Sequence, residues 1–259
     1  MYAHLTLETT GSIATLSLNR PERLNALSLD TLRELEQAAK AIALREDVRA
    51  VVVAGKGRSF SAGADLSGFP APATKGARAA ADAGRRMADA VEAIPQITIA
   101  RIQGWCVGGG LVIAAACDLR VATKGTRFSI PEVDLGIPLA WGGIPRLVRE
   151  IGPALTKELV ITCRPFDAHE ALGAGFLNHV VEDEELDSKV NELADAVARR
   201  ARFPVQATKR HVDAVTSTMV GLERAWADAD SLLAGLQEPE CIEAREAYLS
   251  VLAEKRSGG

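Results

Sequence analysis

The 259-residue chain has few cysteines, no excess of positive charge and no long hydrophobic run. Its four cysteines form no C-x-x-C pair and have no histidine at metal-ligand spacing, so we expect reduced thiols, no metal site and no disulfide framework. Lys and Arg total 30 against 34 Asp and Glu, and this net charge of −4 argues against nucleic acid as a partner. The most apolar stretch, residues 104–117, contains four glycines and is too short to cross a membrane, and the N-terminus lacks the pattern of a signal peptide. We therefore expect a cytoplasmic protein with no membrane span.

Hydrophobic periodicity predicts an α/β core followed by helices. Residues 4–8 and 13–18 alternate as two strands of a hairpin, and Ser28 is placed to cap the helix that follows. Continuous β-branched runs at 49–54 and 97–102 indicate strands covered on both faces, and their alternation with helices favours crossover connections. After residue 154 the pattern is almost entirely helical, with predicted helices near 154–163, 167–173, 184–201, 205–235 and 239–254. We expect residues 1–200 to form the core and residues 201–259 to form a helical C-terminal region.

Two segments rich in small residues each follow a predicted buried strand. They are residues 59–66 (SFSAGADL) and residues 104–118 (GWCVGGGLVIAAACD). Neither segment spells a phosphate-binding loop, a dinucleotide fingerprint or a nucleophile elbow. Consecutive glycines before an apolar helix let a ligand approach the backbone and leave N–H groups free to bind it. Such a place can stabilise an oxyanion.

With residues 130–137 (IPEVDLGI), these two segments resemble the crotonase family, also called the enoyl-CoA hydratase/isomerase superfamily. Residues 18–27 (LNRPERLNAL) and 171–181 (ALGAGFLNHVV) resemble its N-terminal signature and its closing turn. The resemblance implies an α/β fold, a spiral of ββα units, with a C-terminal helical region that builds trimers. It further implies an acyl-CoA thioester substrate, a homotrimer or a hexamer, no cofactor besides the CoA of the substrate, and no metal.

By position in the family motifs, the N–H groups of Ala64 and Gly109 correspond to the pair that holds the thioester carbonyl, and Glu132 corresponds to a catalytic acid/base. A well-placed oxyanion donor contributes about 3–4 kcal/mol to catalysis. Each residue also has an ordinary alternative. Ala64 could be small for packing, Gly109 could serve a tight turn, and Glu132 could be a solvated carboxylate at a strand end.

Family members that hydrate enoyl-CoA resemble one another in carrying a second glutamate, where this chain has Val112. Adding water requires two acid/base groups, whereas moving a double bond from Δ3 to Δ2 requires one base that removes the C2 proton and returns it at C4. We therefore expect a Δ3-Δ2-enoyl-CoA isomerase. Enoyl-CoA hydratase, other enolate chemistry on acyl-CoA and a non-catalytic acyl-CoA binding protein remain alternatives. Dienoyl-CoA isomerisation is disfavoured because the extra carboxylates it uses would stand at Val112 and Ala140.

The resemblance also suggests contacts with the CoA portion of the substrate. Arg20 and Arg23 lie in the N-terminal signature and are expected near the phosphates, while the adenine is expected against the backbone of Ala62. Asp65 and Leu66 close the first oxyanion segment, although Asp65 could equally cap a helix.

Three further positions have competing interpretations. Trp141 either lines the acyl pocket or fills the core. Lys209 is a weaker candidate for phosphate binding, and a solvated basic side chain is the better expectation for it. Asp118 and Arg120 are expected to form a buried polar pair with no role in chemistry.

Overall fold

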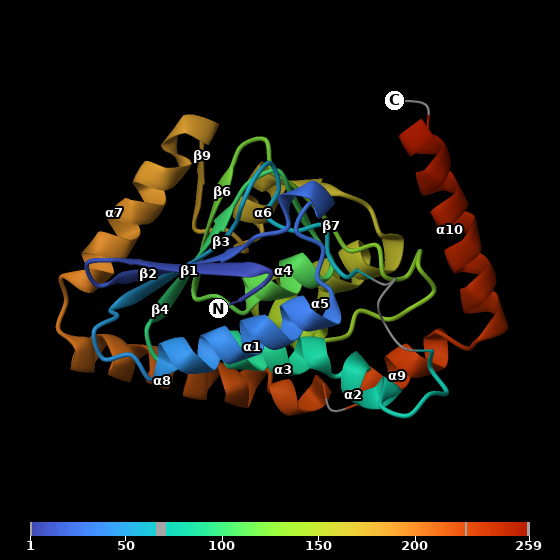
Figure 1. Ribbon diagram of the computed structural model, residues 1–259, viewed down its shortest axis with the longest axis horizontal. Coiled ribbons are helices and arrows are strands. Elements are labelled where there is room, and N and C mark those ends of the chain that lie inside the picture. Colours follow the sequence, from blue (N-terminus) through green and yellow to red (C-terminus); the bar gives the residue numbers. More distant parts are fainter. Residues whose placement is uncertain (1, 66–70, 226, 258–259) are drawn as a thin grey trace.

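The computed structural model describes residues 2–65, 71–225 and 227–257, and it is built around a six-stranded sheet (Figure 1). The strand order is β1-β2-β3-β4-β6-β9, with β1 and β2 antiparallel and every other neighbouring pair parallel. The predicted hairpin is therefore correct, and the two β-branched runs are central strands. The bounds of these strands are β1 Leu5–Thr10, β2 Ile13–Leu18, β3 Ala50–Gly55, β4 Ile97–Ile102, β6 Leu119–Thr123 and β9 His179–Val181.

Both faces of the sheet are covered, which explains why its central strands are apolar without alternation. Alternate residues such as Val52 and Ile99 pack against α7 (Leu186–Ala198) on one face. Their neighbours Val53 and Ala100 belong to the main core with α1 (Leu29–Ala43), α3 (Ala83–Glu92) and α4 (Gly109–Ala115). Figure 1 shows α7 on one side of the sheet and α1 and α3 on the other.

A second, three-stranded sheet consists of β5 (Trp105–Val107), β7 (Arg127–Ser129) and β8 (Phe166–Asp167). The chain passes from β4 directly to β5 and then α4, and again from β6 to β7 and then α5 (Gly143–Thr162). Each turn thus places one strand in each sheet and then a helix. This is the expected spiral of ββα units.

The predicted helix caps and ends are only partly correct. The Ser28 hydroxyl accepts a hydrogen bond from the Thr31 N–H group at 3.2 Å, as expected of an N-cap. The predicted helix near 154–163 is the second half of α5, which is kinked at Gly152. Before the C-terminal region, the structure also describes the 3-10 segments η1 Pro21–Arg23 and η3 Asp183–Glu185, with α2 Ala77–Ala81 and α6 Ala168–Gly173.

The C-terminal region differs most from the expectation. The single helix predicted over 205–235 is wrong: the chain forms α8 (Arg202–Met219), η4 (Leu222–Ala225) and α9 (Asp228–Gly235). The break occurs where Val220 takes an extended backbone before Gly221. The short strands β8 and β9 lie within the part predicted to be almost entirely helical, because strands of two or three residues are too short to show periodicity.

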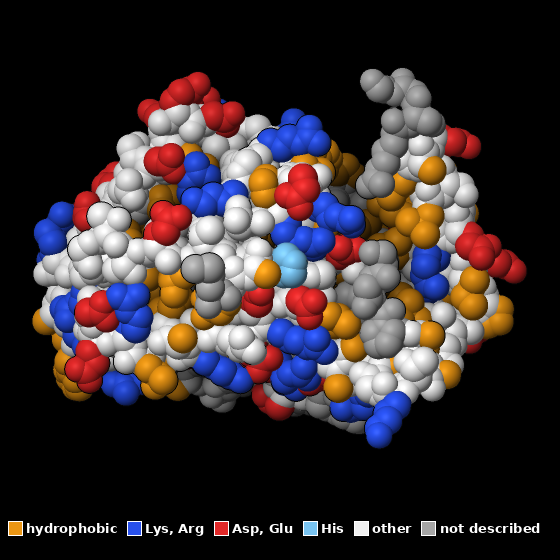
Figure 2. Space-filling model, viewed as in Figure 1, with side chains coloured by type: hydrophobic (Ala, Val, Ile, Leu, Met, Phe, Trp, Pro, Cys, Tyr) orange, Lys and Arg blue, Asp and Glu red, His pale blue; other side chains and the backbone are white. Residues whose placement is uncertain are grey.

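The last helix, α10 (Pro239–Ser257), stands at one end of the molecule (Figure 1). Figure 2 shows hydrophobic side chains gathered along it, whereas the rest of this face mixes basic and acidic side chains. None of the helices in the described ranges is both long enough and apolar enough to span a bilayer.

Candidate active site

The two segments that follow buried strands lie side by side because Ser61 joins them. The Ser61 N–H group donates to the Trp105 carbonyl, and the Val107 N–H group donates to the Ser61 carbonyl, both at 3.0 Å. The buried Ser61 hydroxyl donates to the Asn25 carbonyl and accepts from the Gly63 N–H group. These hydrogen bonds attach the loop after β3 to β5. Because α4 follows β5 directly in the chain, they also hold the loop beside the start of α4.

Ala64 lies on this loop with its N–H group turned away from Leu27. Gly63 and Asp65 on either side both bond to the backbone of Leu27, at 2.8 and 3.0 Å, so Ala64 faces the opposite way. Gly63 has φ +86°, and a β-carbon there would lie 3.7 Å from the Gly109 nitrogen. Within the described part of the chain, neither the Ala64 nor the Gly109 N–H group donates to a backbone carbonyl. Two adjacent segments thus offer two free donors.

Glu132 reaches the same place from the turn after β7. A β-carbon on Gly108, which has φ +47°, would lie 2.3 Å from Glu132 Oε1, so a side chain at position 108 would displace the carboxylate. Glu132 Oε2 is buried and has no hydrogen-bond partner among the described residues. Burial raises the pKa of this carboxyl to about 7, opposed only by a backbone hydrogen bond. Glu132 is therefore not the solvated carboxylate of the alternative interpretation.

An apolar cavity of about 250 Å³ connects these groups. Val112 and Ala140, where the resemblance to the crotonase family led us to look for further carboxylates, both line it with apolar side chains. Glu132 is the one acid among its described lining residues. These are Ala64, Ala71, Pro72, Gly109, Val112, Glu132, Ile137, Pro138, Leu139, Ala140, Trp141, Leu232, Leu236 and Arg245.

Several of these lining residues had no signal in the sequence. Leu232 comes from α9, Leu236 directly follows that helix, and Arg245 comes from α10, more than a hundred residues after Glu132. The Arg245 guanidinium donates to the carbonyls of Leu135 and Gly235, at 3.0 and 3.3 Å, so it fastens α10 to the wall of the cavity. A solitary arginine in a helix is indistinguishable from a surface residue until the fold places it.

Trp141 lines the cavity and is only 6% exposed, so both functions considered for it remain compatible with its position. Its backbone has φ +61°, a left-handed conformation that is rare for a bulky residue and costs on the order of 1–3 kcal/mol.

The predicted CoA contacts lie beside the first oxyanion segment. The Arg20 guanidinium donates to the Ala26 carbonyl at 2.7 Å and lies 3.3 Å from the Asp65 carboxylate. Arg23 lies 4.0 Å from the same carboxylate, and its side chain is 61% exposed. Ala62 donates its N–H group to the Leu24 carbonyl, so Ala62 follows the same rim.

Leu66, the remaining residue predicted at this rim, lies outside the described residues. No group of three His, Cys, Asp or Glu side chains within the described ranges could hold a metal ion.

Two expectations for polar residues are wrong. Lys209 is neither solvated nor at the cavity, because its ammonium group is buried and lies 2.7 Å from Asp118 Oδ2. Asp118 and Arg120 do not pair with each other, since the Arg120 guanidinium binds Glu150 and nearby carbonyls. In both ion pairs, Lys209–Asp118 and Arg120–Glu150, the partners are distant in the sequence, so the local sequence could not predict them.

Comparisons with known proteins agree with this architecture. The profile of the enoyl-CoA hydratase/isomerase family matches residues 8–257. The chain is 37% identical, over 208 residues and 80% of both chains, to the short-chain-enoyl-CoA hydratase of Clostridium acetobutylicum. It is 34% identical over 228 residues, 81% of this chain and 82% of the relative, to a peroxisomal Delta(3,5)-Delta(2,4)-dienoyl-CoA isomerase of Arabidopsis thaliana.

Solved structures show the same fold. The enoyl-CoA hydratase/isomerase from Xanthobacter autotrophicus Py2 gives a TM-score of 0.85 at 29% identity, covering 96% of this chain and 97% of that chain. An enoyl-CoA hydratase/carnithine racemase from Magnetospirillum magneticum gives 0.79 at 34% identity, covering 83% and 82%. The chain therefore belongs to the enoyl-CoA hydratase/isomerase family, the crotonase family whose motifs it carries.

Proposed function

We propose that this enzyme is a Δ3-Δ2-enoyl-CoA isomerase with Glu132 as its only acid/base. The observation that carries the proposal is a single buried carboxylate, without a partner among the described residues, in an otherwise apolar cavity beside two free backbone N–H groups. A pKa of about 7 suits a group that must take up and release the same proton near neutral pH.

The reaction needs only these groups. The thioester carbonyl oxygen of a 3-enoyl-CoA accepts hydrogen bonds from the N–H groups of Ala64 and Gly109, which stabilise the developing enolate. The Glu132 carboxylate removes the C2 proton, the C2 electrons form the new C2–C3 double bond as the old π bond shifts, and the carboxyl returns the proton at C4. No water is consumed, so no second carboxylate is required at Val112.

Hydration is the second candidate because relatives such as the Clostridium acetobutylicum protein are named hydratases. A hydratase must also orient and deprotonate water. Val112 and Ala140 supply no group for this, which is why isomerisation is favoured.

Incubating the purified enzyme separately with 3-enoyl-CoA and 2-enoyl-CoA, and following both products by chromatography, tests the proposal. We expect rapid conversion of 3-enoyl-CoA and slow hydration of 2-enoyl-CoA. Fast hydration would assign the protein to the hydratases, and tight acyl-CoA binding without turnover would identify a non-catalytic binding protein.

The CoA portion is proposed to lie along the rim formed by Ala62 and the Arg20–Asp65 pair, with the exposed guanidinium of Arg23 nearest its phosphates. No cofactor besides this CoA is proposed.

A homotrimer or a dimer of trimers is also proposed. The C-terminal helix α8 exposes large apolar side chains, including Phe203 (76%) and Met219 (77%), which another subunit would cover. Sedimentation at micromolar concentration should show no dominant monomer.

A further inference from the structure

The indole of Trp141 occupies a slot between helices α3 and α4 that exists because two facing residues are glycines. A β-carbon on Gly84 would lie 1.9 Å from the indole Cδ2 atom, and one on Gly109 would lie 2.2 Å from Cζ3. Neither glycine has a positive φ angle, so its backbone conformation does not require glycine. Both positions are therefore small because the ring needs the space.

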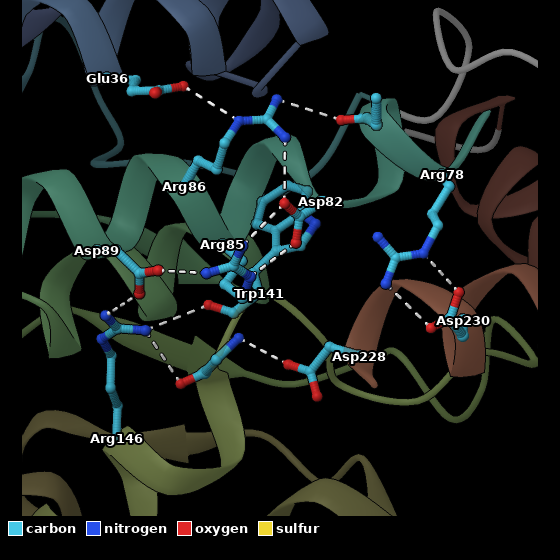
Figure 3. Close-up of polar contacts among 12 residues, drawn as sticks. Glu36, Arg78, Asp82, Arg85, Arg86, Asp89, Trp141, Arg146, Asp228 and Asp230 are labelled. Carbon is cyan, nitrogen blue, oxygen red and sulfur yellow. Dashed lines mark hydrogen bonds and ion pairs between the residues drawn. The ribbon is translucent and has the colours of Figure 1, made fainter. Parts of the chain in front are cut away.

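The backbone that carries the ring is held in its left-handed conformation by side chains from two other elements (Figure 3). The Arg146 guanidinium donates to the carbonyls of Trp141 and Gly142, at 3.3 and 3.2 Å. Asp228 on α9 accepts the Gly142 N–H group at 2.7 Å. A strained conformation persists only when its surroundings impose it, and here they do.

Arg146 is itself held in place. It is 1% exposed, and its guanidinium pairs with Asp89 at 3.0 Å and with Glu92, both on α3. The helix that forms one wall of the slot thus also holds the arginine that directs the ring into it. The Trp141 ring, the two glycines that make room for it and the backbone that carries it are therefore linked to one another at the wall of the cavity.

We propose that Trp141 determines which acyl chains the cavity accepts, favouring short chains, and that Arg146 and Asp228 are positioning residues for it. This inference rests on acyl-CoA being the substrate, as the proposed function states. The ring fills the space between α3 and α4 into which a longer chain would otherwise extend. The cavity that remains, about 250 Å³, is smaller than the roughly 300–1,000 Å³ usual for small-molecule sites.

Calorimetric titration with butanoyl-, octanoyl- and dodecanoyl-CoA tests this without relying on turnover. Trp141→Ala should raise the ratio of dodecanoyl- to butanoyl-CoA affinity by about tenfold or more, because one methylene in a fitted pocket alone changes selectivity by about 10–200-fold. Gly84→Ala should act in the opposite direction, because its methyl group pushes the ring out of the slot toward the cavity.

The two substitutions should not be additive. In the Trp141→Ala background the slot is empty, so Gly84→Ala should leave the affinity ratio unchanged within about twofold. If Trp141 only fills the core, Trp141→Ala would lower the thermal stability and leave the ratio unaltered, and the inference would be overturned. Should Trp141→Ala fail to fold, Trp141→Phe should give a smaller shift in the same direction.

Asp228 and Asp230 supply a matched pair of variants on one helix. The Asp230 carboxylate lies 2.8 Å from Arg78 at the surface and faces that guanidinium instead of the Trp141 turn (Figure 3). Asp228→Ala should therefore shift the affinity ratio toward longer chains by several-fold, whereas Asp230→Ala should not. Equal shifts in both variants would refute the positioning role of Asp228.

The failure of this inference is distinguishable from the failure of the proposed function. If none of the three thioesters binds the wild-type protein, acyl-CoA is not the ligand and the proposed function falls with it. If all three bind and no variant changes their relative affinities, only the role of Trp141 is rejected.

Discussion

Glu132 and Asp118 are carboxylates at opposite ends of helix α4, and their surroundings differ in nearly every respect. Glu132 lies against Gly108 at the start of the helix, and its Oε2 atom has no hydrogen-bond partner among the described residues. Asp118 follows the end of the helix, and its Oδ2 atom accepts from the Lys209 ammonium, the Thr98 N–H group and the Thr98 hydroxyl.

The difference separates a reactive group from a structural one. Three donors bind Oδ2 of Asp118, which joins α8 to the sheet. Among the described residues Glu132 has neither a paired cation nor a side-chain donor, so its charged form is costly and its pKa is raised to about 7. A carboxylate that costs stability is expected where function requires it.

The largest expected effect is on turnover. Glu132→Gln keeps the shape of the side chain but cannot accept a proton, so isomerisation should fall by about 10²–10⁴, while acyl-CoA affinity stays within about tenfold. Steady-state rates and calorimetric titration measure the two quantities. Asp134→Asn, two residues along the same turn and exposed, is the control and should retain activity. Full activity in Glu132→Gln would show that another group is the base.

For the Asp118 ion pair we expect an effect on stability and none on turnover. Lys209→Met leaves the partly buried Asp118 carboxylate without its cation and should lower the free energy of unfolding by about 3 kcal/mol, while turnover per folded molecule is retained. Urea denaturation measures the loss. The control is Lys189→Met, which removes a pair with the exposed carboxylate of Glu192 and should cost no more than about 0.5 kcal/mol. Comparable losses in the two variants would contradict the structural role.

The raised pKa of Glu132 predicts how stability varies with pH. The folded protein retains a proton on Glu132 up to about pH 7, whereas the unfolded chain loses it near its ordinary pKa of 4.5. Protonated Glu132 therefore contributes about 3 kcal/mol to the free energy of unfolding below pH 4.5. This contribution is lost as the pH rises through 7. Urea denaturation of the wild type and of Glu132→Gln over pH 4.5–8 gives the free energy of unfolding of each protein. The difference at each pH isolates the contribution of Glu132. A difference that does not vary with pH would show that the carboxyl has its ordinary pKa.

The smallest expected effect is a gain of activity. Val112→Glu introduces a second carboxylate into the cavity, one helical turn from Gly109, and should raise the hydration of 2-enoyl-CoA by about tenfold. The gain is limited because Val112 packs against Gly143 and the new charge lies in an apolar site. Val112→Gln, similar in size but unable to accept a proton, is the control, and an equal gain in both variants would exclude general-base catalysis.

Much of the site could be predicted from local sequence. The segments at 59–66 and 104–118 could be recognised because each follows a predicted buried strand, but the pairing of Ala64 with Gly109 came from the family resemblance. The family resemblance identified Glu132, but the sequence did not predict its burial or its lack of partners among the described residues. Those depend on Gly108 and on the cavity walls contributed by α9 and α10.

Local sequence was enough to predict the hairpin, the buried strands, the Ser28 cap and the two segments rich in small residues, because hydrophobic period and turn chemistry act over a few neighbouring residues. The folded chain is needed to show that Lys209 pairs with Asp118, 91 residues away, and that the Trp141 ring enters a slot between Gly84 and Gly109. Both arrangements arise from where the crossovers bring distant elements together. A local pattern cannot specify such contacts, since they depend on the packed path of the whole chain.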